Sequence, residues 1–226
     1  MYERLARLST MAHDFTPMLA VHDAVRRDLI RFVTLLGGTA PVDVERAAAL
    51  GRQWQLVAGR VIEHEQLEDD VLWPAARAAV PTQEQGPLDR MAALHEQLIG
   101  VLATASALFA TGAAAASGPE GGAARRALAD VIERAAVLAD KQFAYEERTV
   151  SALLDAWLPA TDWAAFVATL HAPSGPLVDP VLLPWLLEGS RPDRASRLLD
   201  LIGADHRVAY EQDWKPAHRQ RTAEVW

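Results

Sequence analysis

The chain has 226 residues, of which 50% are hydrophobic and 23% charged, as in an ordinary globular protein of one large domain or one domain with an extension. Its net charge of −8 argues against nucleic acid or an anionic membrane as a partner. The absence of cysteine excludes disulfides, thiolate metal sites and cysteine nucleophiles. We find no signal pattern and no apolar run of membrane-spanning length, so a cytoplasmic location without membrane contact is expected.

Apolar residues recur at helical spacing in four long stretches, which predicts four α-helices joined by short connections. The expected bounds are 18–36, 42–73, 87–110 and 123–154. The second helix is expected to end at Trp73 and Pro74, because proline disfavours a helical residue before it. This leaves 74–86 as a connector, and residues 111–124 form a Gly- and Ala-rich loop before the fourth helix.

The composition changes after residue 158, where the tail becomes richer in proline and tryptophan. Short helical pieces are expected near 161–171, 181–188 and 192–202, and no stretch alternates as a strand would. We therefore predict an all-α protein, with an antiparallel four-helix bundle over 1–158 and a helical extension over 159–226 that packs on the bundle. The apolar stretch 182–189 could instead form the surface of a homodimer.

Polar side chains occur on the apolar stripes of all four predicted helices, where core residues are expected. His64 and Glu68 are four residues apart and share one helix face, and Gln142 and Glu146 repeat that spacing. A buried carboxylate is costly unless it is paired or binds a metal. Helical rise along each expected helix places these groups, together with His22 and His95, at similar heights in the bundle.

Imidazoles and carboxylates that converge from several helices are the ligands with which bundles hold iron or manganese. We therefore predict a metal centre in this layer. The candidate ligands are His22, His64, Glu68, His95, Gln142 and Glu146. The acidic residues that follow the two glutamates are expected to lie partly toward solvent; they are Asp69, Asp70 and Glu147. The remaining histidines are expected on the surface or in loops; they are His13, His171, His206 and His218.

Pieces of the chain resemble the hemerythrin-like (HHE cation-binding) proteins, especially their longer bacterial members. These pieces are VHDAVRRDL, HEQLEDDVLWP, MAALHEQL, QFAYEERTV and, in the tail, VLLPWLLEG and WKP. The resemblance implies a bundle that holds non-haem iron, commonly as a pair. The ligands that it implies are His22, His64, Glu68, His95 and Glu146. The chain departs from the pattern at Gln142, a neutral amide where a histidine would stand, and at Ile99, where oxygen-carrying hemerythrins have a further histidine.

Because Gln142 replaces a histidine ligand of the pattern, three states of the site are possible: it could hold two metal ions, one iron or no metal. With metal, the chain would bind, sense or detoxify a small diatomic gas (O₂ or NO) or peroxide. An oxidase or oxygenase of a small organic substrate is the alternative, with a pocket that the tail builds from Trp185 and Trp214. A cavity larger than a diatomic molecule beside the site would favour this alternative. Without metal, the bundle would serve as an interaction module.

Overall fold

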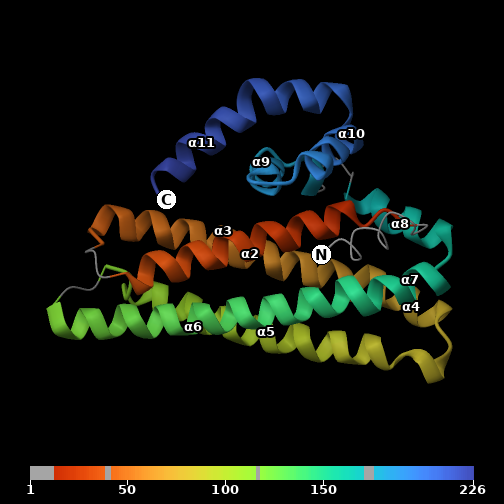
Figure 1. The fold of residues 1–226 in the computed structure, drawn as a ribbon, viewed down its shortest axis with the longest axis horizontal. Helices are drawn as coiled ribbons and strands as arrows, with labels where there is room; N and C mark the ends of the chain where they lie inside the picture. The colour runs from red at the N-terminus through yellow and green to blue at the C-terminus, as the bar shows by residue number, and fades with distance from the viewer. Residues whose placement is uncertain (1–12, 39–41, 116–117, 171–175) are drawn as a thin grey trace.

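Four long helices carry the apolar stripes and form an antiparallel bundle (Figure 1). They are α2 (Thr16–Gly37), α3 (Val44–Leu67), α5 (Gly86–Ala110) and α6 (Gly118–Tyr145). The computed structural model describes residues 13–38, 42–115, 118–170 and 176–226, and no strand occurs in these ranges. The predicted fold class, an all-α bundle with a C-terminal helical extension, is confirmed.

Local sequence signals account for the helix starts. Pro17 and Pro87 lie in the first turns of α2 and α5, where a missing N–H group removes no helical hydrogen bond. Asp43 caps α3, since its carboxylate accepts a hydrogen bond of 2.7 Å from the backbone N–H of Arg46. The stripes then meet in a core of fully buried side chains, among them Leu29, Phe32, Trp54, Val57, Leu98, Leu102, Leu128, Ile132 and Phe143.

The prediction that Pro74 ends the second helix is wrong. α3 continues through a π-helical turn, η1 (Glu68–Leu72), into α4 (Trp73–Ala79). In this turn the backbone N–H of Trp73 bonds the carbonyl of Glu68, five residues earlier. The wider turn places Pro74 in the first turn of α4, where a proline is tolerated. The connector to α5 is correspondingly shorter than expected.

The fourth helix contains a second π-helical turn. α6 passes through η3 (Glu146–Val150) into α7 (Ser151–Trp157). Each of these two turns therefore begins on one of the predicted carboxylate ligands, Glu68 or Glu146. Such turns are rare and occur frequently at functional sites, because they change the direction in which nearby side chains point.

The C-terminal extension lies over α2 and α3 (Figure 1). Its helices are α8 (Ala160–Leu170), α9 (Leu182–Leu187), α10 (Pro192–Ala209) and α11 (Lys215–Ala223), with a π-helical turn, η5 (Tyr210–Trp214), before α11. α9 packs against α2, and all six of its residues are buried. The stretch that could have formed a dimer surface is therefore covered within this chain.

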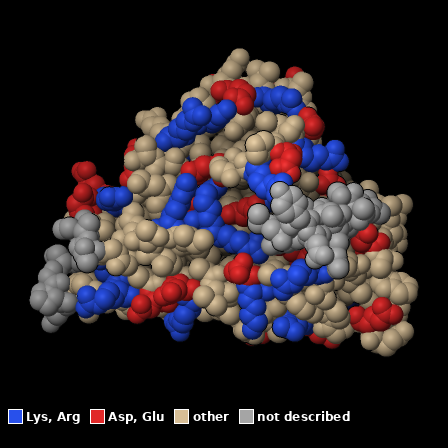
Figure 2. Space-filling view, viewed as in Figure 1, with Lys and Arg blue, Asp and Glu red and all other residues tan. Residues whose placement is uncertain are grey.

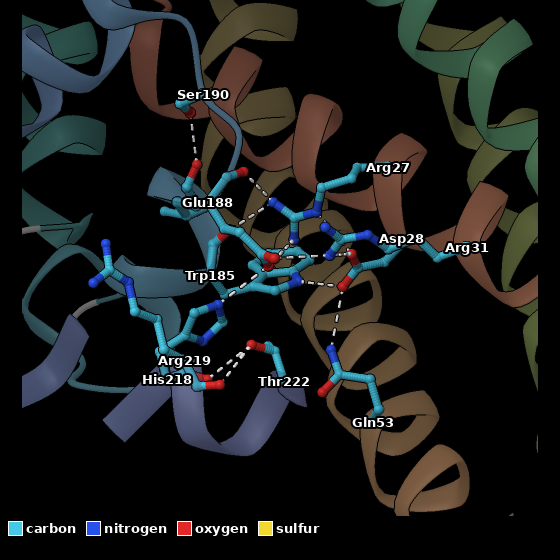
Figure 3. A network of polar contacts seen from close by, with 11 residues as sticks. Arg27, Asp28, Arg31, Gln53, Trp185, Glu188, Ser190, His218, Arg219 and Thr222 are labelled. Carbon is cyan, nitrogen blue, oxygen red and sulfur yellow. Dashed lines mark hydrogen bonds and ion pairs between the residues drawn. The ribbon is translucent and has the colours of Figure 1, made fainter. Parts of the chain in front are cut away.

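A buried carboxylate joins the extension to the bundle (Figure 3). Asp28 of α2 is fully buried and accepts hydrogen bonds from Trp185 Nε1 at 2.8 Å and from Gln53 Nε2 at 3.2 Å. Arg27 pairs with Asp28 at 2.8 Å and also bonds the carbonyl oxygen of Trp185 at 3.0 Å. Glu188, just after α9, pairs with Arg31 at 3.0 Å. These contacts compensate the burial of Asp28 and position α9.

Ion pairs continue along the seam between the extension and the bundle. Arg194 of α10 pairs with Asp23 of α2, and Arg197 bonds Asp14 at 2.7 Å. In Figure 2, acidic and basic side chains are interspersed over the visible face, and several basic side chains follow this seam. Exposed pairs of this kind each contribute little stability, so Asp28 and its buried partners are the stronger connection.

We expect Trp185→Phe to lower the free energy of unfolding by about 2 kcal/mol, since it removes a buried N–H donor to a carboxylate and replaces the indole with a smaller ring. Trp157→Phe is the matched control. Trp157 Nε1 also donates to a carboxylate, that of Glu84, at 3.2 Å, but this pair is exposed, so a change within about 0.5 kcal/mol is expected. Urea unfolding of both variants measures the difference. Equal effects would show that Asp28 does not fix the extension.

The expectation that no segment is long and apolar enough to span a membrane is wrong for α5. By length and composition it meets that test, as the only helix that does so in the described part of the chain. Its Met91, Leu94, Leu98 and Leu102 side chains are buried in the bundle. The core helix of a bundle passes the same test, so this property of α5 gives no argument for a membrane.

Candidate metal centre

The structure brings the six predicted ligand residues together in one layer of the bundle. α2 contributes His22, α3 contributes His64, and α5 contributes His95. The two π-helical turns contribute Glu68 and Glu146, and α6 contributes Gln142. All are buried except His64, whose side chain is 11% exposed, so the layer reaches the outside at this residue.

Two imidazoles and a carboxylate form a compact group on one side of the layer. His22 Nε2 lies 3.3 Å from His64 Nε2 and 3.3 Å from Glu146 Oε2. One ligand atom from each of the three residues lies within 4.8 Å of the other two. Two histidines and one carboxylate with open positions are the ligand set of many non-haem iron centres.

Glu68 connects this group to His95. Its Oε1 lies 3.3 Å from His64 Nε2, and its Oε2 lies 3.6 Å from His95 Nε2. Each oxygen of the carboxylate thus faces a different imidazole. This arrangement suits a carboxylate that is shared between two neighbouring cations.

Carboxylates behind two of the imidazoles fix their orientation. Glu147 Oε1 lies 3.1 Å from His22 Nδ1 and accepts a hydrogen bond of 2.6 Å from Arg26 Nη1, and Asp69 Oδ1 lies 3.1 Å from His95 Nδ1. A carboxylate beside Nδ1 favours the tautomer whose Nε2 carries a lone pair toward the layer. Phe143 also stacks on His22, with ring centroids 4.0 Å apart.

The prediction that the acidic residues after Glu68 and Glu146 lie partly toward solvent is only partly correct. Asp69 and Asp70 are exposed, although Asp69 still reaches His95. Glu147 is buried at 4% exposure, contrary to expectation. The reason is the π-helical turn: it spreads one turn over more residues, so neighbouring side chains are rotated by a smaller angle and both Glu146 and Glu147 point inward.

Glu65 is a buried carboxylate at the layer that the sequence interpretation missed. Its side chain is fully buried, and its Oε1 accepts a hydrogen bond of 2.9 Å from Gln142 Nε2. The helical spacing of Val61, Glu65, Glu68 and Leu72 was the available signal, since this series continues the buried stripe of α3.

Burial dominates the electrostatics of the metal-free layer. It raises the pKa of Glu65 to about 8 against the opposing effect of the Gln142 hydrogen bond. Burial and the charge of Glu146 raise the pKa of Glu68 well above its usual value, and burial raises that of Glu146. Burial and the neighbouring His22 lower the pKa of His64 to about 3. A neutral imidazole at His64 is the form that binds metal.

Several buried atoms of the layer have no hydrogen-bond partner among the described residues. They are Glu65 Oε2, Glu68 Oε2, both carboxylate oxygens of Glu146, His95 Nε2 and Gln142 Oε1. An unsatisfied buried polar group costs about 1–3 kcal/mol, and more if it is charged. The oxygen atoms in this set can each donate a lone pair to a cation, and His95 Nε2 can do so when it carries no proton. The residues present therefore fit non-haem iron or manganese.

Of the histidines expected on the surface or in loops, His13 lies in the non-helical stretch before α2 but is buried, and His218 is a buried residue of α11. His13 stacks on Trp163, with centroids 4.9 Å apart, and His218 bonds Glu188 at 3.2 Å. In both cases the C-terminal extension supplies the cover, which local spacing does not predict. His206 is exposed as expected, and His171 lies outside the described residues.

An apolar cavity of about 270 Å³ lies between the bundle and the extension. Met18 and Val21 of α2 line it on one side, and Phe166 and Leu182 of the extension line it on the other. His64 and Glu68 also lie in its wall, so the cavity meets the polar layer. The extension therefore builds a chamber beside the candidate metal centre.

Comparison with known protein families identifies a relationship over the first part of the chain. The family model of the hemerythrin HHE cation-binding domain matches residues 13–137, more than half of the chain. The matched region includes His22, His64, Glu68 and His95, and it ends before Gln142. No curated protein and no solved structure matches the chain.

Proposed function

This chain belongs to the hemerythrin HHE cation-binding family, and we propose that it holds non-haem iron with which it binds, senses or detoxifies O₂, NO or peroxide. The observation that carries the proposal is the group of buried His22 and Glu146 with partly exposed His64, whose ligand atoms lie within 4.8 Å of one another. Iron with this ligand set retains open positions for small molecules.

The surrounding residues suit this role. Glu147 and Asp69 orient His22 and His95, and Arg26 balances the charge of Glu147 beside the layer. The apolar cavity meets the layer at His64, the one partly exposed ligand. The lining is mainly apolar, although Arg60, Glu63 and Asp179 also belong to it, so the cavity suits a small uncharged molecule.

We expect anaerobic reconstitution with Fe(II) to load at least one iron per chain, and the visible spectrum to change when O₂, NO or peroxide is added. His22→Gln should reduce the bound iron at least tenfold, because it removes a buried imidazole of the group. His206→Gln is the matched control, since His206 is exposed and should retain the metal content of the parent. Elemental analysis after desalting measures both. Less than one-tenth of an iron or manganese per chain in the parent protein would contradict the proposal.

The cavity favours a second candidate function, a metal-dependent oxidase or oxygenase of a small organic substrate. A cavity of about 150 Å³ is enough to bind benzene. The chamber beside His64 and Glu68 is larger, at about 270 Å³, and its lining is mainly apolar. It therefore has room for an apolar molecule larger than a diatomic gas.

Filling the cavity tests this second candidate. We expect ligand-observed NMR to detect indole or benzene binding to the metal-loaded protein. Val21→Phe should weaken this binding by narrowing the chamber and should leave the metal content unchanged. Val137→Phe adds the same bulk at an exposed position, so binding should persist. If both variants bind the probes like the parent protein, the chamber is not a substrate site.

A further inference from the structure

The polar layer has two halves that differ in their ligands. One half contains His22, His64 and Glu146, a complete group of two imidazoles and a carboxylate. On the other side, the one carboxylate that pairs with His95 Nε2 among the described residues is that of Glu68, with Oε2 at 3.6 Å. A single imidazole and a shared carboxylate are a sparse set for a second cation.

Glu65 and Gln142 occupy the remaining polar positions at this layer. α2 and α5 each pack against both α3 and α6, so the bond from Gln142 to Glu65 spans the core between α3 and α6. Gln142 turns its amide nitrogen toward Glu65, and its Oε1 has no hydrogen-bond partner among the described residues. Gln142 thus acts as a donor that holds the carboxylate.

Glu65 has an oxygen available for a cation. Its Oε1 accepts the bond from Gln142, and its Oε2 is buried without a hydrogen-bond partner among the described residues. Glu65 precedes Glu68 by three residues, a spacing at which side chains are neighbours on one helix face. No Lys or Arg hydrogen bond or ion pair to Glu65 is found in the described part of the chain. A fully buried carboxylate with one amide donor is incompletely compensated.

We propose that Glu65, oriented by Gln142, is the third protein ligand of a second metal ion that it binds together with His95 and Glu68. The proposal rests on the proposed function, because it concerns the same layer. It makes the second position rich in carboxylate and poor in imidazole. Oxygen ligands suit harder cations, so the composition of this position is compatible with manganese or iron.

The alternative is a purely structural pair, in which a protonated Glu65 and Gln142 bond one another and no metal is involved. Glu65→Gln distinguishes the two. It preserves the size of the side chain and a hydrogen-bonding amide next to Gln142, and it removes the negative charge. Gln142→His offers an imidazole at the same place in the core and serves as the rescue.

The experiment counts metal ions per chain after anaerobic loading with Fe(II) and, separately, Mn(II), followed by desalting. We expect two per chain in the parent protein and one in Glu65→Gln, and a return to two in the double variant Glu65→Gln with Gln142→His. Glu63→Gln is the matched control, because Glu63 lies on the other side of His64 in sequence and is exposed, so it should retain two.

Melting of the metal-free proteins provides the folding control. Glu65→Gln removes a buried carboxylate, so its metal-free melting temperature should equal or exceed that of the parent. The inference is overturned if Glu65→Gln keeps two ions, if the parent holds only one, or if Gln142→His fails to restore the lost ion. A parent protein that holds no metal overturns the proposed function as well, which separates the two failures.

Discussion

Replacing Glu68 with glutamine should weaken metal binding at least 100-fold and at the same time raise the melting temperature of the metal-free protein. The two effects have one cause. Glu68 is 1% exposed, and its oxygens face His64 and His95 at 3.3 and 3.6 Å. Bound metal would compensate the charge of this carboxylate. Without metal, burial and the charge of Glu146 make the carboxylate unfavourable, and a neutral amide removes that cost.

The stability gain in the metal-free state should be about 1–3 kcal/mol, because the buried carboxylate is replaced by a neutral amide of the same size. Calorimetry of metal-free protein and chelator competition for affinity measure the two quantities. Glu96→Gln is the matched control, since Glu96 follows the ligand His95 directly in sequence but is exposed, and it should change neither. A variant that loses stability in the metal-free state would indicate that Glu68 has a structural role in the bundle instead.

The metal-free protein should lose stability as the pH rises from about 6.5 to 8, whereas the metal-loaded protein should not. The pKa of Glu65 rises from 4.5 in the unfolded chain to about 8 in the folded protein, and that of Glu68 is also raised. The folded state therefore binds more protons than the unfolded state in this window, and stability falls with pH. Glu65 alone should account for about 2 kcal/mol over this range.

At lower pH the titration of His64 opposes the effect of the carboxyl groups on stability. The folded pKa of His64 is lowered from 6.5 to about 3, so its contribution to stability is lost as the pH falls below 6.5. Between about 4.5 and 6.5 the effect of His64 opposes that of Glu65, whereas the raised pKa values of Glu68 and Glu146 act in the same direction as that of Glu65, so metal-free stability should fall less steeply than above 6.5. Bound metal requires deprotonated ligands, so loaded protein should become more stable as the pH rises through the same range.

Melting temperatures of metal-free and metal-loaded protein at about pH 5, 6.5 and 8 test this pair of opposite slopes. Glu65→Gln should flatten the metal-free slope above about pH 6.5, because it removes one of the titrating groups. Metal-free and loaded protein with the same pH dependence would show that the buried layer does not bind the added cation.

Helix periodicity made much of the fold and of the candidate site predictable from the sequence. An α-helix repeats every 3.6 residues, so a residue's face is a local property that spacing alone reveals. The four stripes, the presence of His22 and His95 on them, and the spacing of His64 and Glu68 could all be recognised in this way. Because the bundle is antiparallel with short connections, approximate heights along the helices also placed these residues in one layer.

The positions that were not predicted are those that depend on another helix or on a change in backbone geometry. Glu147 points inward because a π-helical turn begins at Glu146, and the helix passes Pro74 because another begins at Glu68. The spacing of Glu65 indicates that it faces the core, but its contact with Gln142, a residue 77 positions away, depends on the packing of another helix.

Local residue order was enough to place His22, Glu68 and His95 on core-facing stripes, since burial of the apolar stripes of four helices directs their polar members inward as well. What those polar groups meet could be learned only from the folded chain: Glu68 lies between two imidazoles, Glu65 contacts Gln142, and the extension closes a chamber at His64. The physical reason is that helix periodicity is set by neighbouring residues, whereas ligand distances and cavities arise from the packing of segments that are far apart in the chain.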